Sequence, residues 1–288
     1  MLKLQTPVTD QPCKVGISYD DKILMLGSCF SDNIGRQLAD FGFDVCVNPF
    51  GTLYNPVSIL QSVELLAGSG LFGTDDCVQI GAGDERWCSF SHHTSFARGS
   101  VDEFLSNANT ALQAARSFFA GCNKIIITLG TAWCFRNVGT GRVVSNCLKR
   151  PAAEFVRERL SSAEVTSCLQ RIAALFPDKE FIFTVSPIRH FKDGAHGNQV
   201  SKASLLLGVE DFMAGYAGVA DYFPAYEIMM DELRDYRFYA EDMCHPSPQA
   251  VDYIRERFIT WALPASEQGR LEENIRSFKR SQHLSLHR

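Results

Sequence analysis

The sequence predicts an α/β fold in which a mainly parallel, five-stranded sheet carries helices on both faces. Short apolar runs that end at Gly, Pro or Ser recur along the chain, and segments with helical spacing separate them. Strands that alternate with helices are joined by right-handed crossovers and therefore lie parallel. The 288 residues are 45% hydrophobic and 21% charged, which is enough to build a sizeable core.

The elements follow in order along the chain. The segments with the pattern of buried strands are 22–28, 44–50, 124–129, 180–185 and 221–226. The segments with helical patterns are a first helix capped by Ser31 or Asp32 and ended by Gly42, then 57–67, 102–119, a helix that follows the Ser161–Glu164 capping box to Phe176, 198–217 and 247–262.

Two insertions interrupt this pattern. The excursion 68–101 is rich in Gly, Asp and Ser, with short strands expected around 77–80 and 87–91. Residues 133–148 alternate around two glycines and predict a hairpin. We expect one domain over 1–263, followed by a polar tail, 264–288, that lies on the surface or frays.

Composition restricts the partners. A net charge of −5 argues against general nucleic-acid binding, which needs a basic face. No stretch reaches the length of a membrane span, and the first 20 residues have no signal-peptide pattern, so a cytoplasmic protein without a membrane partner is expected. The 10 cysteines form no C-x-x-C pair, which favours free, mostly buried thiols.

The chemistry of such a sheet is expected just after the strands, because ligands bind at the carboxyl ends of parallel strands. Ser28 follows the first apolar run, and a serine becomes a nucleophile when a histidine takes its proton. Asp242 and His245 lie three residues apart in a late loop, where the carboxylate can orient the ring. The sequence therefore predicts a Ser28–His245–Asp242 triad, against the alternative that Ser28 only caps a helix.

An oxyanion hole is expected beside this serine. The N–H of Ser28 would lie near a helix N-terminus, and Gly51 after the second strand could supply another N–H. Gly130 and Thr131 follow the third strand and belong to the same predicted rim.

Other residues are weaker candidates. His92, in the excursion, is expected to face substrate or to be structural; a metal site is disfavoured because no ligand spacing is present. Arg189, beside His190 after the fourth strand, could clamp a carboxylate or phosphate, or form a surface ion pair. Cys29 could be a thiol nucleophile, but its apolar flank favours an inert thiol.

Several strings resemble one known family. Residues 27–31 read GSCFS and are similar to the motif that names the GSCFA-domain family, whose usual fifth residue is alanine. Residues 48–56, 129–133, 186–190 and 242–247 look like further blocks of that family, in order.

The GSCFA family is related to the SGNH/GDSL hydrolases, so the resemblance implies a three-layer, flavodoxin-like fold and an ester-hydrolase ancestry. It implies Ser28 as nucleophile, His245 as base, Asp242 as the orienting group and Gly51 as an oxyanion donor. One position departs from the hydrolase pattern: Ala132 stands where an asparagine is usual. Thr131, Asn48 or Asn55 would have to replace it, or the oxyanion hole is weaker.

The resulting hypothesis is a serine hydrolase or acyl transferase that needs no metal or organic cofactor. Its substrate would be a small-molecule or carbohydrate-like acyl or acetyl ester. The alternative is a binding protein that keeps the hydrolase fold without the chemistry, which the missing asparagine motivates. Nucleotide or phosphate binding is disfavoured, because neither G-x-G-x-x-G nor a Walker A string is present.

Overall fold

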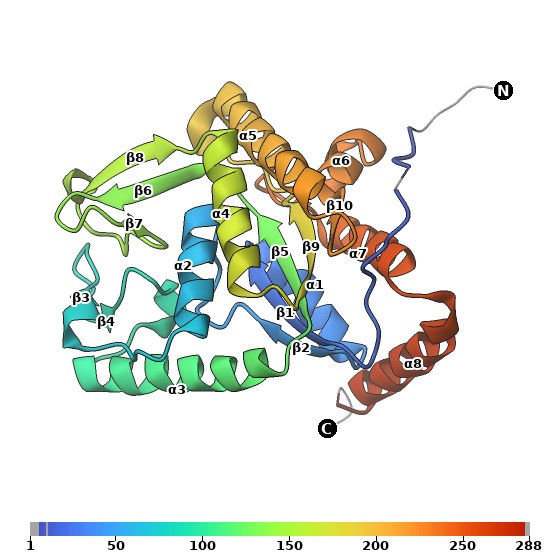
Figure 1. Ribbon diagram of the computed structural model, residues 1–288, viewed down its shortest axis with the longest axis horizontal. Coiled ribbons are helices and arrows are strands. Elements are labelled where there is room, and N and C mark those ends of the chain that lie inside the picture. Colours follow the sequence, from blue (N-terminus) through green and yellow to red (C-terminus); the bar gives the residue numbers. More distant parts are fainter. Residues whose placement is uncertain (1–5, 10, 286–288) are drawn as a thin grey trace.

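The centre of the molecule is a five-stranded parallel sheet, seen in a computed structural model that describes residues 6–9 and 11–285 (Figure 1). Every neighbouring pair of strands in it is parallel. Along the sheet the strands are β10 (Ala220–Phe223), β9 (Glu180–Val185), β5 (Lys124–Leu129), β1 (Lys22–Gly27) and β2 (Asp44–Val47). Counted along the chain this is the order 2-1-3-4-5, so the predicted flavodoxin-like fold is confirmed.

Helices cover both faces of this sheet (Figure 1). One face carries α2 (Pro56–Ala67), α3 (Val101–Ala120), α4 (Ser162–Leu175) and α5 (Gly194–Gly215). The other face carries α1 (Cys29–Asp40) and α7 (Pro248–Ala262). Successive strand side chains alternate between the faces, so Leu24 and Ile125 enter the first core while Ile23 and Ile126 enter the second. None of the described helices is both long and apolar enough to cross a membrane.

The insertions form two small antiparallel sheets. The excursion contributes β3 (Val78–Gln79) and β4 (Trp87–Cys88). The predicted hairpin is confirmed as β6 (Trp133–Asn137) with β7 (Val143–Val144), but a third strand, β8 (Phe155–Arg159), extends it on the other side of β6. The sequence signal for β8 is weak because FVRER lacks regular apolar and polar alternation.

Several predicted ends were wrong. Helix α1 begins at Cys29, because Ser28 rather than Ser31 or Asp32 is its N-cap. Strand β2 ends at Val47 and not at residue 50, because Asn48 has φ 42° and starts a turn. Helix α5 begins four residues earlier than expected, at Gly194 instead of 198.

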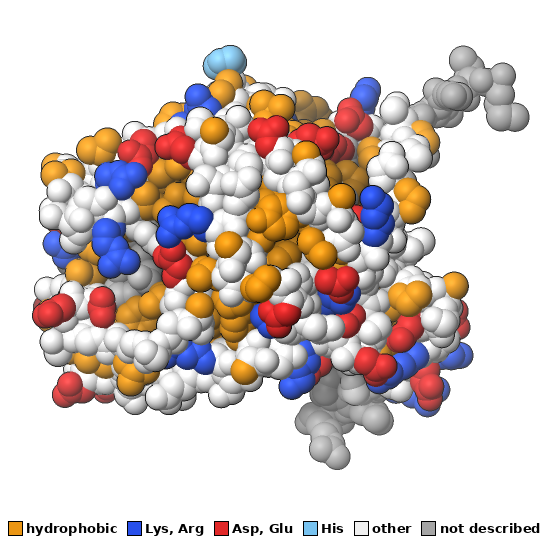
Figure 2. All heavy atoms as spheres, viewed as in Figure 1, with side chains coloured by type: hydrophobic (Ala, Val, Ile, Leu, Met, Phe, Trp, Pro, Cys, Tyr) orange, Lys and Arg blue, Asp and Glu red, His pale blue; other side chains and the backbone are white. Residues whose placement is uncertain are grey.

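The polar C-terminal segment is ordered as helix α8 (Gln268–Ser285). Leu271 is buried, and the Asn274 amide donates to the Phe41 carbonyl at the end of α1 (2.9 Å). Figure 2 shows acidic and basic side chains interspersed on this part of the surface, at the lower right. The described part of this segment is therefore a helix docked against α1.

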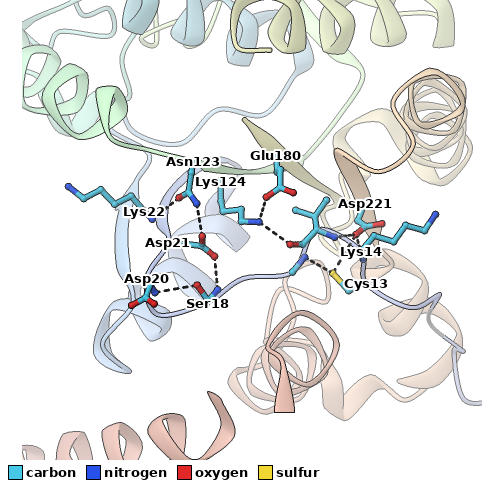
Figure 3. Close-up of polar contacts among 12 residues, drawn as sticks. Cys13, Lys14, Ser18, Asp20, Asp21, Lys22, Asn123, Lys124, Glu180 and Asp221 are labelled. Atoms are coloured by element: carbon cyan, nitrogen blue, oxygen red, sulfur yellow. Dashed lines mark hydrogen bonds and ion pairs between the residues drawn. The ribbon is translucent and has the colours of Figure 1, made fainter. Parts of the chain in front are cut away.

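The N-terminal segment closes the sheet at the amino ends of its strands (Figure 3). The Asp221 carboxylate accepts hydrogen bonds from the backbone N–H groups of Lys14 (2.6 Å) and Val15 (2.7 Å). Lys124 donates to the Val15 carbonyl (2.9 Å) and pairs with Glu180. The N-terminal segment thus covers the amino ends of the strands. The carboxyl ends of the strands are left as the place for a functional site.

Candidate active site

A cavity of about 540 Å³ opens at the carboxyl ends of the strands, and we call it the strand-end cavity. Its lining includes Cys29 after β1, Thr131 after β5, and Arg189 after β9. His245 enters from the late loop 241–247, while the small β6–β7–β8 sheet supplies Trp133 and other side chains of the opposite wall. The β6–β7–β8 insertion therefore forms one wall of the strand-end cavity, where ligands are expected to bind in this fold.

The predicted pair Asp242 and His245 is joined by a hydrogen bond. The ring Nδ1 lies 2.6 Å from the Asp242 Oδ2. The other carboxylate oxygen accepts from the backbone N–H groups of Cys244 and His245, both at 2.9 Å. These N–H groups, followed by the ring, lower the pKa of Asp242 to about 2. Asp242 is therefore a carboxylate at neutral pH and holds the His245 ring through Nδ1.

Ser28 lies at the turn from β1 into α1 and is 1% exposed. Its Oγ accepts a hydrogen bond from the Phe30 N–H (3.3 Å), which makes Ser28 the N-cap of α1. No hydrogen bond joins Ser28 to His245 among the residues that the structure describes. In the structure Ser28 therefore caps helix α1, which is the alternative role that the sequence allowed. The next residue in the chain, Cys29, lines the strand-end cavity.

Cys29 is the alternative nucleophile, because its side chain lines the cavity. Burial, with the charge of Asp32 as a smaller cause, raises the pKa of this thiol. The thiol is therefore protonated at neutral pH, whereas a reactive cysteine needs a lowered pKa.

The loop between β2 and α2 ties down two strand ends. At the end of β1, Gly27 donates to the Asn48 side chain (2.8 Å) and accepts from Leu53 (2.8 Å). At the end of β5, the N–H groups of Gly130 and Thr131 both donate to the Tyr54 carbonyl, at 2.9 Å each. This loop fixes the cavity floor, and it engages the N–H groups of Gly130 and Thr131.

The expected oxyanion donors are engaged elsewhere. The Gly51 N–H donates to the Asn48 carbonyl (2.8 Å) and closes a turn. Gly51 has φ 83°, and a Cβ there would lie 2.3 Å from the His93 Cβ, so the glycine serves the turn and its packing. The Ser28 N–H donates to the Thr128 carbonyl (3.3 Å). The expectation that Ser28 and Gly51 offer free N–H groups was therefore wrong for this structure.

Asn48, Thr131 and Asn55 were the possible replacements for the missing asparagine. Their hydrogen bonds show which of them has a donor group available. The Asn48 amide bonds Gly27 and donates to Asp32 (2.7 Å). The Thr131 hydroxyl bonds the Ser201 hydroxyl (3.0 Å) and accepts from Trp133. Asn55 caps α2 through Oδ1, which accepts from Ser58 (2.9 Å), and it lines the cavity. Its Nδ2 has no partner among the described residues, so Asn55 is the one of the three whose donor atom takes part in no hydrogen bond there.

The two adjacent histidines of the excursion have different places. His92 is fully buried among the rings of Phe50, Phe72, Phe96 and Phe104, and burial lowers its pKa to about 4. His92 was expected either to face substrate or to be structural, and these contacts show that it is structural. His93 lines the strand-end cavity instead, and the sequence gives no signal that separates the pair.

Two buried or half-buried basic side chains, His190 and Lys202, lie at or near the cavity. His190 lines it, and burial, together with the charge of Lys202, lowers the pKa of its ring to about 4. Lys202, on α5, is 1% exposed and donates to the carbonyls of Gly130 and Ser186 at 2.7 Å each. Burial and then the charge of Arg189 lower its pKa to about 7. Lys202 therefore joins the ends of β5 and β9, and sequence reasoning missed it because nothing distinguishes it from a surface helix lysine.

The family follows from a match over most of the chain. The model of the GSCFA family matches residues 22–258. The chain belongs to the GSCFA family. In this GSCFA member the fifth motif residue is Ser31, which is buried and donates from Oγ to the Leu26 carbonyl (3.3 Å). The hydroxyl is thus satisfied within the turn that the GSCFA motif forms.

Solved structures give weaker likenesses, and no curated protein sequence matches this GSCFA chain. An acetyl xylan esterase (Est2A) from the rumen bacterium Butyrivibrio proteoclasticus is 12% identical, with a TM-score of 0.44; 85% of this chain is covered, and 64% of that one. A Clostridium thermocellum family 3 carbohydrate esterase is 12% identical, with a TM-score of 0.37 and coverages of 88% and 98%. A Corynascus thermopiles (Myceliophthora fergusii) carbohydrate esterase family 2 enzyme with a carbohydrate binding domain is 15% identical, with a TM-score of 0.42 and coverages of 88% and 67%.

Proposed function

We propose that this GSCFA protein is a serine hydrolase or acyl transferase that acts on an ester. The observation that carries the proposal is the hydrogen bond of 2.6 Å between Asp242 and the His245 ring, beside a cavity that Cys29, the neighbour of Ser28, also lines. Ser28 is the nucleophile, His245 the base and Asp242 the orienting group. An acyl or acetyl ester of a carbohydrate-like alcohol is the first substrate to test.

In the proposed reaction the Ser28 oxygen attacks the ester carbonyl and its proton passes to the His245 Nε2. The alcohol then leaves with that proton, and water or an acceptor alcohol attacks the acyl-enzyme in the same way. The Phe30 N–H donates to the Ser28 oxygen, so the hydroxyl hydrogen stays free for a base. The His245 side chain is 49% exposed, and the reaction requires it to approach Ser28 when substrate fills the cavity.

The proposed oxyanion hole uses donors that the fold leaves unengaged. The Cys29 N–H is the first of helix α1 and meets its own sulfur but no oxygen acceptor among the described residues, and the positive end of the helix dipole lies there. The Asn55 Nδ2 is the second donor, since Asn55 lines the cavity and only its Oδ1 is used. Asn55 then takes the role of the asparagine that Ala132 replaces.

Replacement of Asn55 by alanine is expected to lower kcat for ester hydrolysis by ~10²–10³, the cost of one oxyanion donor. Asn55→Asp keeps an oxygen that can cap α2 but lacks the N–H₂ group. The denaturant midpoint of unfolding of Asn55→Asp is expected to equal that of the wild type. Its kcat is expected to fall as much as that of Asn55→Ala. Full activity in Asn55→Asp would show that Asn55 acts only as a helix cap.

A fluorophosphonate probe tests the nucleophile directly. We expect one phosphonyl adduct on wild-type protein, located on Ser28 by peptide mass spectrometry. Cys29→Ala is expected to be labelled like the wild type, and Ser28→Ala to stay unlabelled. An adduct on Cys29, or on neither residue, would contradict the proposal.

A binding protein without chemistry is the second candidate. Two observations favour it: Ser28 is 1% exposed, and its oxygen already serves as a helix cap. Absence of label on wild-type protein, with the fold intact, would support this candidate over the hydrolase.

A further inference from the structure

We infer that the ester taken by the strand-end cavity carries a negatively charged oxygen group, a carboxylate or a phosphate, which Arg189 binds. This inference rests on the proposed function and adds the class of its substrate. It follows from the charges around the cavity, the contacts of Arg189 and the shape of the space beside it.

The charges that line the cavity are mostly positive, although the chain as a whole has a net charge of −5. The lining includes Arg157, Arg189 and Lys192, against a single acidic side chain, Asp193. Arg157 and Asp193 form an ion pair with each other. Arg189 and Lys192 form no ion pair among the residues that the structure describes, so the cavity keeps an excess of positive charge.

Arg189 is the better placed of these two cations. Its backbone N–H donates to the Cys244 carbonyl (3.1 Å), which fixes it to the residue just before His245. Its guanidinium lies 5.0 Å from the Phe191 ring centre and 3.5 Å from the Met230 sulfur, and its Nε is buried without a hydrogen-bond partner. A buried guanidinium N–H without an acceptor is costly, and a planar fork of N–H groups matches a carboxylate or phosphate.

A buried lysine, Lys202, interacts electrostatically with Arg189. Lys202 is 1% exposed, and its two hydrogen-bond acceptors are backbone carbonyls rather than carboxylates. Burial first, and repulsion by the charge of Arg189 second, lower the pKa of Lys202 to about 7. An anion bound at Arg189 would relieve this repulsion, whereas a cation or a neutral group would not.

The space beside Arg189 has room for a substrate larger than an acetyl ester. Arg189 also lines a second cavity of about 510 Å³, whose wall includes Phe191, Met230, Tyr236 and Tyr239. Arg189 therefore borders both cavities. The charged group of the substrate binds at Arg189, and the rest of it contacts aromatic and methionine side chains.

Matched esters test the inference. On the alcohol side, 4-carboxyphenyl acetate is compared with its neutral amide, 4-carbamoylphenyl acetate, and with 4-acetoxyphenyl phosphate. On the acyl side, 4-nitrophenyl hemisuccinate is compared with 4-nitrophenyl butyrate. For at least one side, we expect kcat/KM to favour the anionic ester by about 10- to 100-fold, the worth of one hydrogen bond to a charged group. The larger of the carboxylate and phosphate ratios identifies the preferred anion.

The variants Arg189→Gln and Arg189→Lys locate the effect. Arg189→Gln is expected to reduce the anionic-to-neutral ratio of kcat/KM to about 1, and Arg189→Lys to restore part of it. Arg276→Gln removes the same charge from an exposed position of α8 and is expected to keep the wild-type ratio. Equal kcat/KM for anionic and neutral esters on both sides would overturn the anion inference while leaving the proposed hydrolase intact.

A binding measurement separates the two proposals if no ester is hydrolysed. Calorimetric titration with 4-hydroxybenzoate, 4-hydroxyphenyl phosphate and neutral 4-hydroxybenzamide reads the anion subsite without any reaction. Tighter binding of an anion than of the amide, lost in Arg189→Gln, would support the subsite even though the hydrolase proposal had failed. Absence of this difference together with absence of turnover would overturn both.

Discussion

The Asp242→Asn variant is expected to fold normally and to lose ~10⁴ in kcat, the cost of a wrong histidine tautomer. In the wild type one carboxylate oxygen accepts the N–H groups of Cys244 and His245, and the other faces the His245 Nδ1. The oxygen of an asparagine at this position would keep the two backbone N–H groups, since its N–H₂ group cannot accept them.

The amide nitrogen would then face the ring Nδ1 and donate to it. The proton of the neutral ring would move to Nε2, where the base must instead accept the proton of Ser28. The turn 242–245 keeps its hydrogen bonds, so the loss falls on catalysis and not on folding.

Kinetics with a 4-nitrophenyl ester, together with urea unfolding of the same samples, check this result. Asp252→Asn is the matched control, because Asp252 lies on α7 and bonds Gln37 and Arg255 outside the cavity. We expect Asp252→Asn to keep wild-type kcat. If Asp242→Asn stayed within 10-fold of wild type, about 1.4 kcal/mol, Asp242 would not orient the base.

The Gly27→Ala variant is expected to lose about 3 kcal/mol or more of unfolding free energy, from overpacking and backbone strain together. Gly27 has φ 141°, which L side chains rarely adopt. A Cβ there would lie 2.2 Å from the Thr128 carbonyl oxygen of β5, and backbone cannot yield as a side chain tip can. Because domains are stable by about 5–15 kcal/mol, such a loss removes a large part of the total.

Urea unfolding followed by far-ultraviolet circular dichroism measures the effect. Gly269→Ala, on α8, is the matched control: nothing lies within 4 Å of its would-be Cβ, and its φ is not positive. Alanine is the better helix former there, so we expect unchanged or slightly higher stability. A Gly27→Ala variant as stable as the wild type would mean that β1 and β5 separate at little cost.

The sheet was predictable because its strands carry their own signal. The run KIIITL of β5 is buried throughout, and at least one helix lies between each strand of the central sheet and the next along the chain, which favours a parallel order. Strand β8 lacks a clear apolar pattern, whereas helix α8 carries Leu271, Ile275 and Phe278 at helical spacing, a signal that its very polar surroundings obscured. β8 forms because β6 offers an unpaired edge, and α8 because α1 offers a surface for Leu271.

The sequence by itself determined the parallel α/β fold, the GSCFA blocks and the pairing of Asp242 with His245, because each depends on local pattern or short spacing. Only the tertiary structure decided which polar groups remain available. Strand β5 engages the N–H of Ser28, a local turn engages that of Gly51, and the loop before α2 engages that of Gly130. The Asn55 amide nitrogen is left unused, because only the amide oxygen serves as a cap. Tertiary contacts also bury His92 and bring Arg189 to the cavity without a carboxylate partner among the described residues, because packing across the sheet sets burial and charge.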